Sequence, residues 1–218
     1  MESSKSVLKL LGLGAIAFVG LGLEGLLFFL IEPLIYGHFP DDFSTLENIS
    51  HWILTCLVWG IISLLLIKIS INKCSFNMFS LRNSMTKTNW LICAVLAAVS
   101  IILSIIDWDG FKIIKEFTYN GWLKFIFQYI YYIFESVLVV LMIVFAQRAG
   151  EIFFGKKSIP WGGIFTALTW GMIHAATKGS LSEGISSFAD ALLYGLVYIA
   201  CKKNLYVAFP IILLMFVF

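Results

Sequence analysis

Residues 128–135 read Gln-Tyr-Ile-Tyr-Tyr-Ile-Phe-Glu, and an apolar run follows them as far as residue 147. After a short basic loop, residues 166–174 read Thr-Ala-Leu-Thr-Trp-Gly-Met-Ile-His. Each segment therefore places one ionisable side chain, Glu135 or His174, inside a hydrophobic stretch. Ionisable groups are costly to hold in lipid, which makes them candidates for function. We expect the rest of the chain to form an apolar helical bundle around these two residues.

The composition is that of an integral membrane protein. Hydrophobic residues make up 60% of the 218 positions and charged residues 13%, against about 45–50% and about 25% in soluble domains. One membrane domain, residues 1–218, takes up the whole length. The net charge of +2 comes from basic residues spread through short loops, so we predict no nucleic-acid partner. The four cysteines show no CxxC spacing, and we interpret them as free thiols.

A helix needs about 20 apolar residues to cross a bilayer. That length predicts seven spans, at residues 7–36, 51–70, 88–106, 122–147, 160–177, 185–201 and 204–218. With the N-terminus inside, eleven Lys and Arg residues fall on the cytoplasmic side and four outside, which favours an N-in, C-out topology. Residues 107–121 are expected to form a short amphipathic helix in the outer interface. The Ile-, Lys- and Asn-rich composition favours a multi-pass protein of a bacterial cytoplasmic membrane.

Three predicted helices each carry a polar and aromatic stripe at helical spacing. The stripes are Gln128, Tyr131, Tyr132 and Glu135; Thr166, Trp170 and His174; and Ser186, Asp190, Tyr194 and Tyr198. If the stripes face inward, they form one pocket in the middle or outer half of the bundle. The candidate substrate-binding residues are then Gln128, Tyr131, Tyr132, Trp170 and Tyr194.

Glu135 and His174 are the candidate catalytic residues, with Asp190 and Glu151 as weaker ones. A carboxyl group held in an apolar site suits a general base or acid that acts on a water molecule. A neighbouring imidazole would orient the water, stabilise an oxyanion or carry the proton. The result would be amide hydrolysis within the membrane. The alternative is that these groups only hydrogen-bond one another as part of the core, and that Glu151 is solvated at a helix end.

We expect no cofactor. A catalytic zinc ion needs three protein ligands, and His38 and His51 are assigned to the first outer loop. His174 is thus the only histidine expected inside the membrane, and a zinc site made by Glu135, His174 and Asp190 is a minor alternative.

The segments Pro160-Trp-Gly-Gly163 and Trp170-Gly-Met-Ile-His174 resemble the CAAX-protease and bacteriocin-processing family, also called CPBP or Abi. The resemblance covers about residues 120–218. It implies a multi-helix intramembrane endopeptidase with three motifs, Glu-Glu-xxx-Arg, Phe-xxx-His and His-xxx-Asn or His-xxx-Asp. Trp170-xxx-His174 is similar to the second motif, with one aromatic residue in place of another.

The other two motifs are incomplete. The first maps either to residues 135–136, with Val139 or Val140 in the arginine position, or to residues 142–143, with Gln147 or Arg148 in that position. The third motif should place a histidine near residues 213–214, which are both leucine. The loss of one oxyanion donor alone typically costs about 10²–10³ in rate.

Three functions follow from these observations. The first is a CPBP-like protein with a degenerate site that binds a peptide, a lipidated segment or a membrane-protein partner. The second is a working endopeptidase that uses Glu135, with or without Glu151, together with His174. The third is a small membrane transporter or transporter subunit. In each case we expect membrane lipid to surround the protein and to be its first partner.

Overall fold

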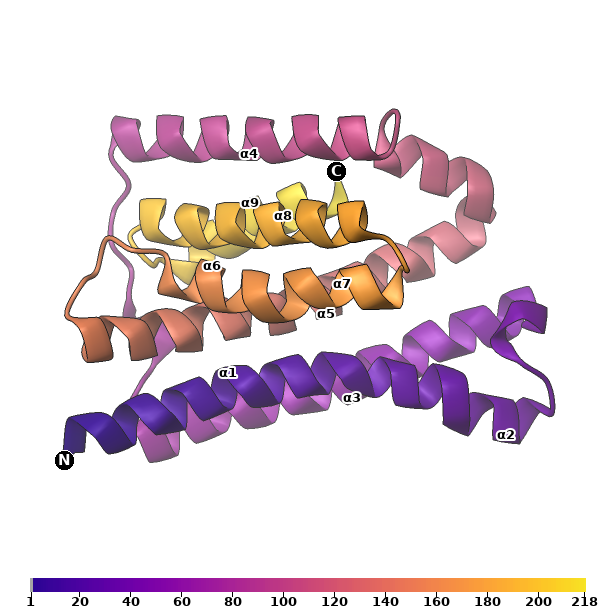
Figure 1. Ribbon diagram of the computed structural model, residues 1–218, viewed down its shortest axis with the longest axis horizontal. Coiled ribbons are helices and arrows are strands. Elements are labelled where there is room, and N and C mark those ends of the chain that lie inside the picture. Colours follow the sequence, from indigo (N-terminus) through magenta and orange to yellow (C-terminus); the bar gives the residue numbers. More distant parts are fainter. Residues whose placement is uncertain (1) are drawn as a thin grey trace.

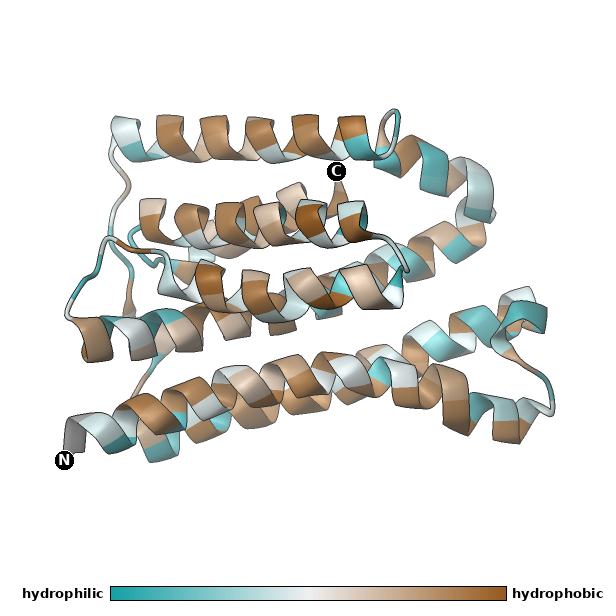
Figure 2. Ribbon diagram, in the orientation of Figure 1, coloured by the Kyte–Doolittle hydropathy of each residue, from teal (hydrophilic) through white to brown (hydrophobic). Residues whose placement is uncertain are grey.

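The computed structural model describes residues 2–218, with side chains from residue 4 onward. Helices make up nearly all of this range, which contains no strand. Four helical segments are long and apolar enough to cross a membrane, namely Ser4–Tyr36, Thr45–Cys74, Lys87–Asp107 and Lys112–Phe154. The hydrophobic colouring of Figure 2 runs along most of their length. The prediction of an all-helical protein with membrane-spanning helices is thus confirmed in its broad form.

The N-terminal half forms two long antiparallel rods and a third helix apart from them. The first rod is α1 (Glu2–Leu26), the π-helical segment η1 (Leu27–Ile31) and α2 (Glu32–Tyr36), and the second is α3 (Thr45–Cys74), after the short η2 (Pro40–Asp42). The segment η3 (Met78–Ser80) leads to α4 (Lys87–Asp107). Ser44 and Glu47 form a capping box at the start of α3, as Thr86 and Asn89 do for α4, so both starts are fixed by local sequence.

The long helix α5 (Lys112–Phe154) is the centre of the bundle. It packs against α1, α3, α6 and α9, and every residue from 138 to 147 is buried. Gly121, at φ 68° and ψ 171°, breaks it into a short first part, residues 112–120, and a long second part. Glycine suits this position because other residues rarely adopt a positive φ. The short part lies where an amphipathic helix was predicted, and its Ile114 and Phe117 are exposed.

The C-terminal helices fill the space between α4 and the pair formed by α1 and α3 (Figure 1). They are α6 (Trp161–Thr166), the π-helical η4 (Ala167–Gly171), α7 (Met172–Thr177), α8 (Leu181–Ala200) and α9 (Leu205–Val217). They lie at the three last predicted spans. They are shorter or less apolar than the four helices named above, so four crossings meet the criteria of length and apolarity.

Glycines permit the closest contact between these helices. A Cβ atom built on Gly195 of α8 would overlap the backbone of Gly163 in α6. Small residues of this kind let membrane helices approach each other.

We therefore expect Gly195→Ala to lower the free energy of unfolding by about 1–3 kcal/mol, since the added methyl group has no space. Gly22→Ala in α1 is the matched control, because nothing lies within 4 Å of its added Cβ. Thermal unfolding of both variants in detergent measures the difference. Equal stability of the two variants would contradict the tight contact between α6 and α8.

Candidate functional site

The indole ring of Trp170 contacts both Glu135 and His174, the two predicted catalytic residues. Its indole Nε1 donates a hydrogen bond of 3.3 Å to Glu135 Oε1. Its ring meets the ring of His174 edge to face, with 4.6 Å between centroids. Within residues 2–218, no hydrogen bond or ion pair joins Glu135 to His174 directly. The two side chains therefore flank one indole ring instead of touching each other.

The tautomer of His174 follows from its backbone contact. Its Nδ1 lies 2.7 Å from the carbonyl oxygen of Trp170. A carbonyl oxygen only accepts, so Nδ1 carries the proton and Nε2 of the neutral ring is an acceptor. Both His174 and Glu135 are half-buried.

The local backbone explains how Trp170 reaches this position. It belongs to η4, a π-helical turn that takes up one more residue than an α-helical turn. Such turns occur mostly as single insertions in α-helices and often at functional sites. The next residue, Gly171, lies against α8, where an added Cβ would be only 2.8 Å from the Cα of Phe188. The close contact with α8 holds the π turn, and with it the indole ring, in place.

Aromatic rings from two further helices enclose Trp170. The ring of Phe216 in α9 lies 5.8 Å from that of Trp170, 6.2 Å from that of Tyr194 and 5.8 Å from that of Tyr132. Three of the predicted substrate-binding residues thus surround Phe216. The side of α9 that faces the bundle is apolar, with Ile212, Met215 and Phe216 buried. The α9 helix therefore contributes an aromatic ring, and no polar side chain, to the surroundings of Trp170.

Gln128 and Tyr132 bond to another carboxylate, that of Glu116. Glu116 is 5% exposed and accepts from the hydroxyl groups of Tyr132, at 2.6 Å, and Tyr129, at 2.9 Å. It also accepts from Gln128 Nε2 at 3.2 Å. The break at Gly121 folds the first part of α5 back and brings Glu116 to these residues. Glu116 was not predicted as a site residue; the signal that could have found it is Gly121, which separates the predicted amphipathic helix from the span that follows.

A second polar cluster lies between α1, α2, α3 and α5. His51 Nδ1 is 3.0 Å from both carboxylate oxygens of Glu32, and its Nε2 is 3.7 Å from Glu24 Oε1. Tyr131 donates a hydrogen bond of 2.7 Å to Glu24. His51 is 3% exposed and Glu32 1% exposed. Because both ring nitrogens face carboxylates, a doubly protonated imidazolium fits this site.

This cluster corrects two predictions. His51 is in the second turn of α3, not in an outer loop, and His174 is therefore not the only histidine inside the bundle. Both carboxylates face His51 because the π-helical segment η1 lies between Glu24 and Glu32. Residues eight apart diverge by about 80° on an α-helix. One extra residue taken up by the π turn makes the spacing equivalent to seven, which aligns both carboxylates on the face toward α3.

The two weaker catalytic candidates have structural partners away from Glu135. Glu151 is 6% exposed, accepts from Gln147 Nε2 at 2.8 Å and forms an ion pair with Lys203. The expectation that it is solvated is wrong. It lies about 24 Å along α5 from Glu135, too far to share a substrate bond with it. Asp190 accepts a hydrogen bond of 2.7 Å from Ser100, which ties α8 to α4.

The zinc alternative fails on geometry. No group of three or more His, Cys, Asp or Glu side chains within the described range is placed to hold a metal ion. Glu135, His174 and Asp190 in particular do not assemble into such a group.

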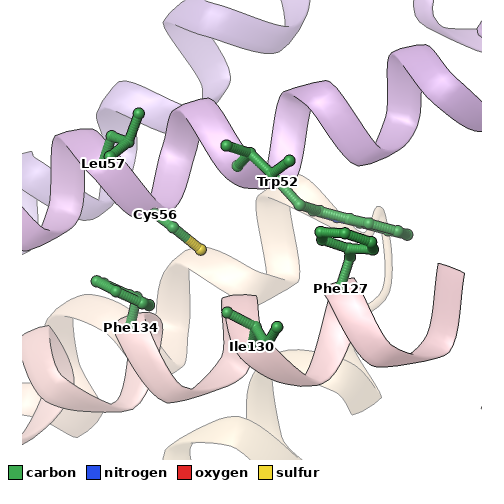
Figure 3. Close-up of a pocket in the computed structure, with 7 residues that line it drawn as sticks. Trp52, Cys56, Leu57, Phe127, Ile130 and Phe134 are labelled. Carbon is green, nitrogen blue, oxygen red and sulfur yellow. The ribbon is translucent and has the colours of Figure 1, made fainter. Parts of the chain in front are cut away.

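Two hollows in the surface of the bundle are apolar. One of about 170 Å³ lies between α3 and α5, where Cys56 points toward α5 and the ring of Trp52 lies beside that of Phe127 (Figure 3). The other, of about 370 Å³, lies between α3, α5 and α9. Neither includes Glu135 or His174. Comparisons of the chain with protein-family models, curated proteins and solved structures found no match.

Proposed function

We propose that this chain is an integral membrane protein with a degenerate CPBP-like site, which binds a peptide, a lipidated segment or a membrane partner without cleaving it. The observation that carries the proposal is the position of Phe216. Its ring packs against Trp170 and Tyr194 from the helix in which the family pattern has its second histidine. Amide hydrolysis by the family pattern needs a polar group from this helix, and residues 205–217 include no His, Asn or Asp.

The polar atoms that remain favour binding. Glu135 receives one hydrogen bond in the described structure, from Trp170, and keeps its second oxygen free. His174 Nε2 is a second free acceptor. The main-chain N–H groups of an extended peptide would donate to both acceptors.

The proposal includes the topology. The seven helical rods are taken to cross the cytoplasmic membrane of a bacterium, with the N-terminus inside and the C-terminus outside. Two observations support this arrangement. Helices are present at all seven predicted positions, and the loops between residues 75 and 86, 155 and 160, and 201 and 204 lie at the same end of the bundle as the N-terminus (Figure 1). That end carries eleven of the fifteen Lys and Arg residues.

Transport is a second candidate function, favoured by the cluster of Glu24, Glu32 and His51. Two carboxylates against one imidazolium leave one negative charge, and ionisable groups inside a membrane bundle commonly line proton or ion pathways. Transport would depend on His51, whereas ligand binding would depend on Trp170. The working endopeptidase is the third candidate and would depend on Glu135 and His174.

The test uses the full chain in liposomes with a panel of fluorescent transmembrane and lipidated peptides. We expect wild-type protein to bind at least one peptide and leave it uncut. Trp170→Ala is expected to weaken that binding about tenfold or more, since a buried indole commonly dominates an interface. Leu168→Ala is the matched control, because Leu168 lies in the same π turn but is 62% exposed.

Mass spectrometry of the peptides separates the candidates. Fragments that disappear in both Glu135→Gln and His174→Ala would overturn the proposal in favour of an endopeptidase. Equal binding by Trp170→Ala and Leu168→Ala would remove the proposed site. Ion or proton uptake that is lost in His51→Ala, without peptide binding, would favour the transporter.

A further inference from the structure

The larger apolar groove, of about 370 Å³, lies apart from the proposed binding site. Ile67 of α3 and Val137 and Leu141 of α5 form its walls, and Phe209 and Pro210 of α9 form its opposite side. Met78 and Phe79 of η3 close one end. The hydroxyl group of Tyr206 is the single polar side-chain group among its lining residues. The groove therefore suits a hydrocarbon chain.

A positively charged side chain, that of Arg82, is held at the mouth of this groove. The guanidinium group of Arg82 donates to the Tyr206 hydroxyl at 3.0 Å and lies 4.7 Å from the centre of the Tyr206 ring. The loop that carries Arg82 is tied to the turn before α9. Asn83 Nδ2 donates to the Lys202 carbonyl at 3.0 Å, and Lys202 Nζ donates to the Ser84 carbonyl at 3.0 Å. Arg82 is thus held beside the groove, with Lys202 next to it.

The positive charge at this mouth is not balanced by the protein. Arg82 and Lys202 take part in no ion pair within residues 2–218. Glu151, the buried carboxylate at this end of the bundle, is already paired with Lys203. The complementary ligand therefore has a negative group at its head and an apolar chain behind it.

We propose that this groove binds one acyl chain of an anionic phospholipid, whose phosphate group pairs with Arg82. Basic pockets between membrane helices on the cytoplasmic side typically hold anionic headgroups in this manner. A zwitterionic lipid would fill the same groove with its chain, but its headgroup brings a cation of its own to Arg82. A partner helix in the groove would leave Arg82 unpaired at its edge. The charge at the mouth thus selects the anionic lipid.

The experiment measures lipid retention by native mass spectrometry. The purified full chain in detergent is mixed with equal amounts of phosphatidylglycerol and phosphatidylcholine. We expect phosphatidylglycerol to be retained about fivefold more strongly, which is the usual contribution of one basic residue near an anionic lipid. Arg82→Gln should abolish this preference, whereas Lys87→Gln should keep it, because Lys87 is an exposed base at the start of α4 that lacks the contact of Arg82 with the lining residue Tyr206.

Ile67→Trp tests the groove independently of charge. The larger side chain fills the groove from α3, and we expect it to reduce the retention of both lipids. The proposal is overturned if wild-type protein shows no preference, if Arg82→Gln behaves like Lys87→Gln, or if Ile67→Trp retains both lipids as wild type does. Retention of phosphatidylglycerol unchanged by all three variants would assign the lipid to the general surface.

Discussion

Replacement of His51 by alanine is expected to lower the free energy of unfolding by about 3–5 kcal/mol, because it leaves the buried carboxylate of Glu32 without its cation. The ring lies 3.0 Å from both oxygens of Glu32, and both side chains are almost fully buried. Without the ring, Glu32 must either keep an unpaired charge or bind a proton in an apolar site, and both states cost free energy. Thermal unfolding followed by tryptophan fluorescence measures the loss, since Trp59 lies 4.8 Å from Tyr131 at this cluster.

Two further variants show whether the loss comes from charge. His51→Ala combined with Glu32→Gln should recover much of the stability, because the second change removes the unpaired carboxylate. His38→Ala should change stability little. His38 contacts Glu47 at 3.3 Å near the surface, where an ion pair contributes little. If His51→Ala is no more harmful than His38→Ala, the cluster does not hold α2 and α3 together.

The sequence predicted those parts of the fold that depend on local sequence patterns. Apolar runs of membrane-spanning length predicted the helices, although α3 and α5 both extend beyond the predicted ends. The start of α3 is visible in the sequence, since Ser44 and Glu47 have the spacing of a capping box. Such features depend on neighbouring residues alone. For the same reason, Glu135, Trp170 and His174 could be assigned to inward-facing stripes from their helical spacing.

What the sequence analysis missed depends on changes of helical period and on contacts between distant residues. The π segment η1 aligns Glu24 with Glu32, although a regular helix would separate them. A hydrophobic pattern read at 3.6 residues per turn cannot show this insertion. The partners His51 and Glu32 are 19 residues apart, and Tyr131 and Glu24 are 107 residues apart. Their pairing follows only from the packing of three helices.

The two π segments connect the missed cluster with the predicted site. One lies between Glu24 and Glu32, and the other contains Trp170. Tyr131 bonds to Glu24 and is one helical turn from Glu135 on α5. A rotation or shift of α5 would therefore move side chains in both clusters. This shared helix gives a physical reason to test the two clusters together, whether the protein binds a peptide or transports an ion.

Lys203→Met is expected to lower the free energy of unfolding by about 3 kcal/mol, because the buried carboxylate of Glu151 then loses its cation. Glu151 also accepts a hydrogen bond from Gln147 Nε2, and Gln147 Oε1 accepts one from the Gly162 N–H at 3.1 Å. The ion pair thus supports the contact of α5 with both α6 and the turn before α9. Glu151→Gln combined with Lys203→Met removes the charge as well as its partner, and should restore most of the stability.

The same pair of variants bears on function. If Lys203→Met unfolds more easily and the double variant regains its stability, Glu151 stabilises the end of α5 that lies far from Glu135. It is then not the second carboxylate that an endopeptidase would need. If Lys203→Met is as stable as wild type, Glu151 is not held by its ion pair. Glu151 would still lie about 24 Å from Glu135 along α5, so this outcome too would not give an endopeptidase its second carboxylate.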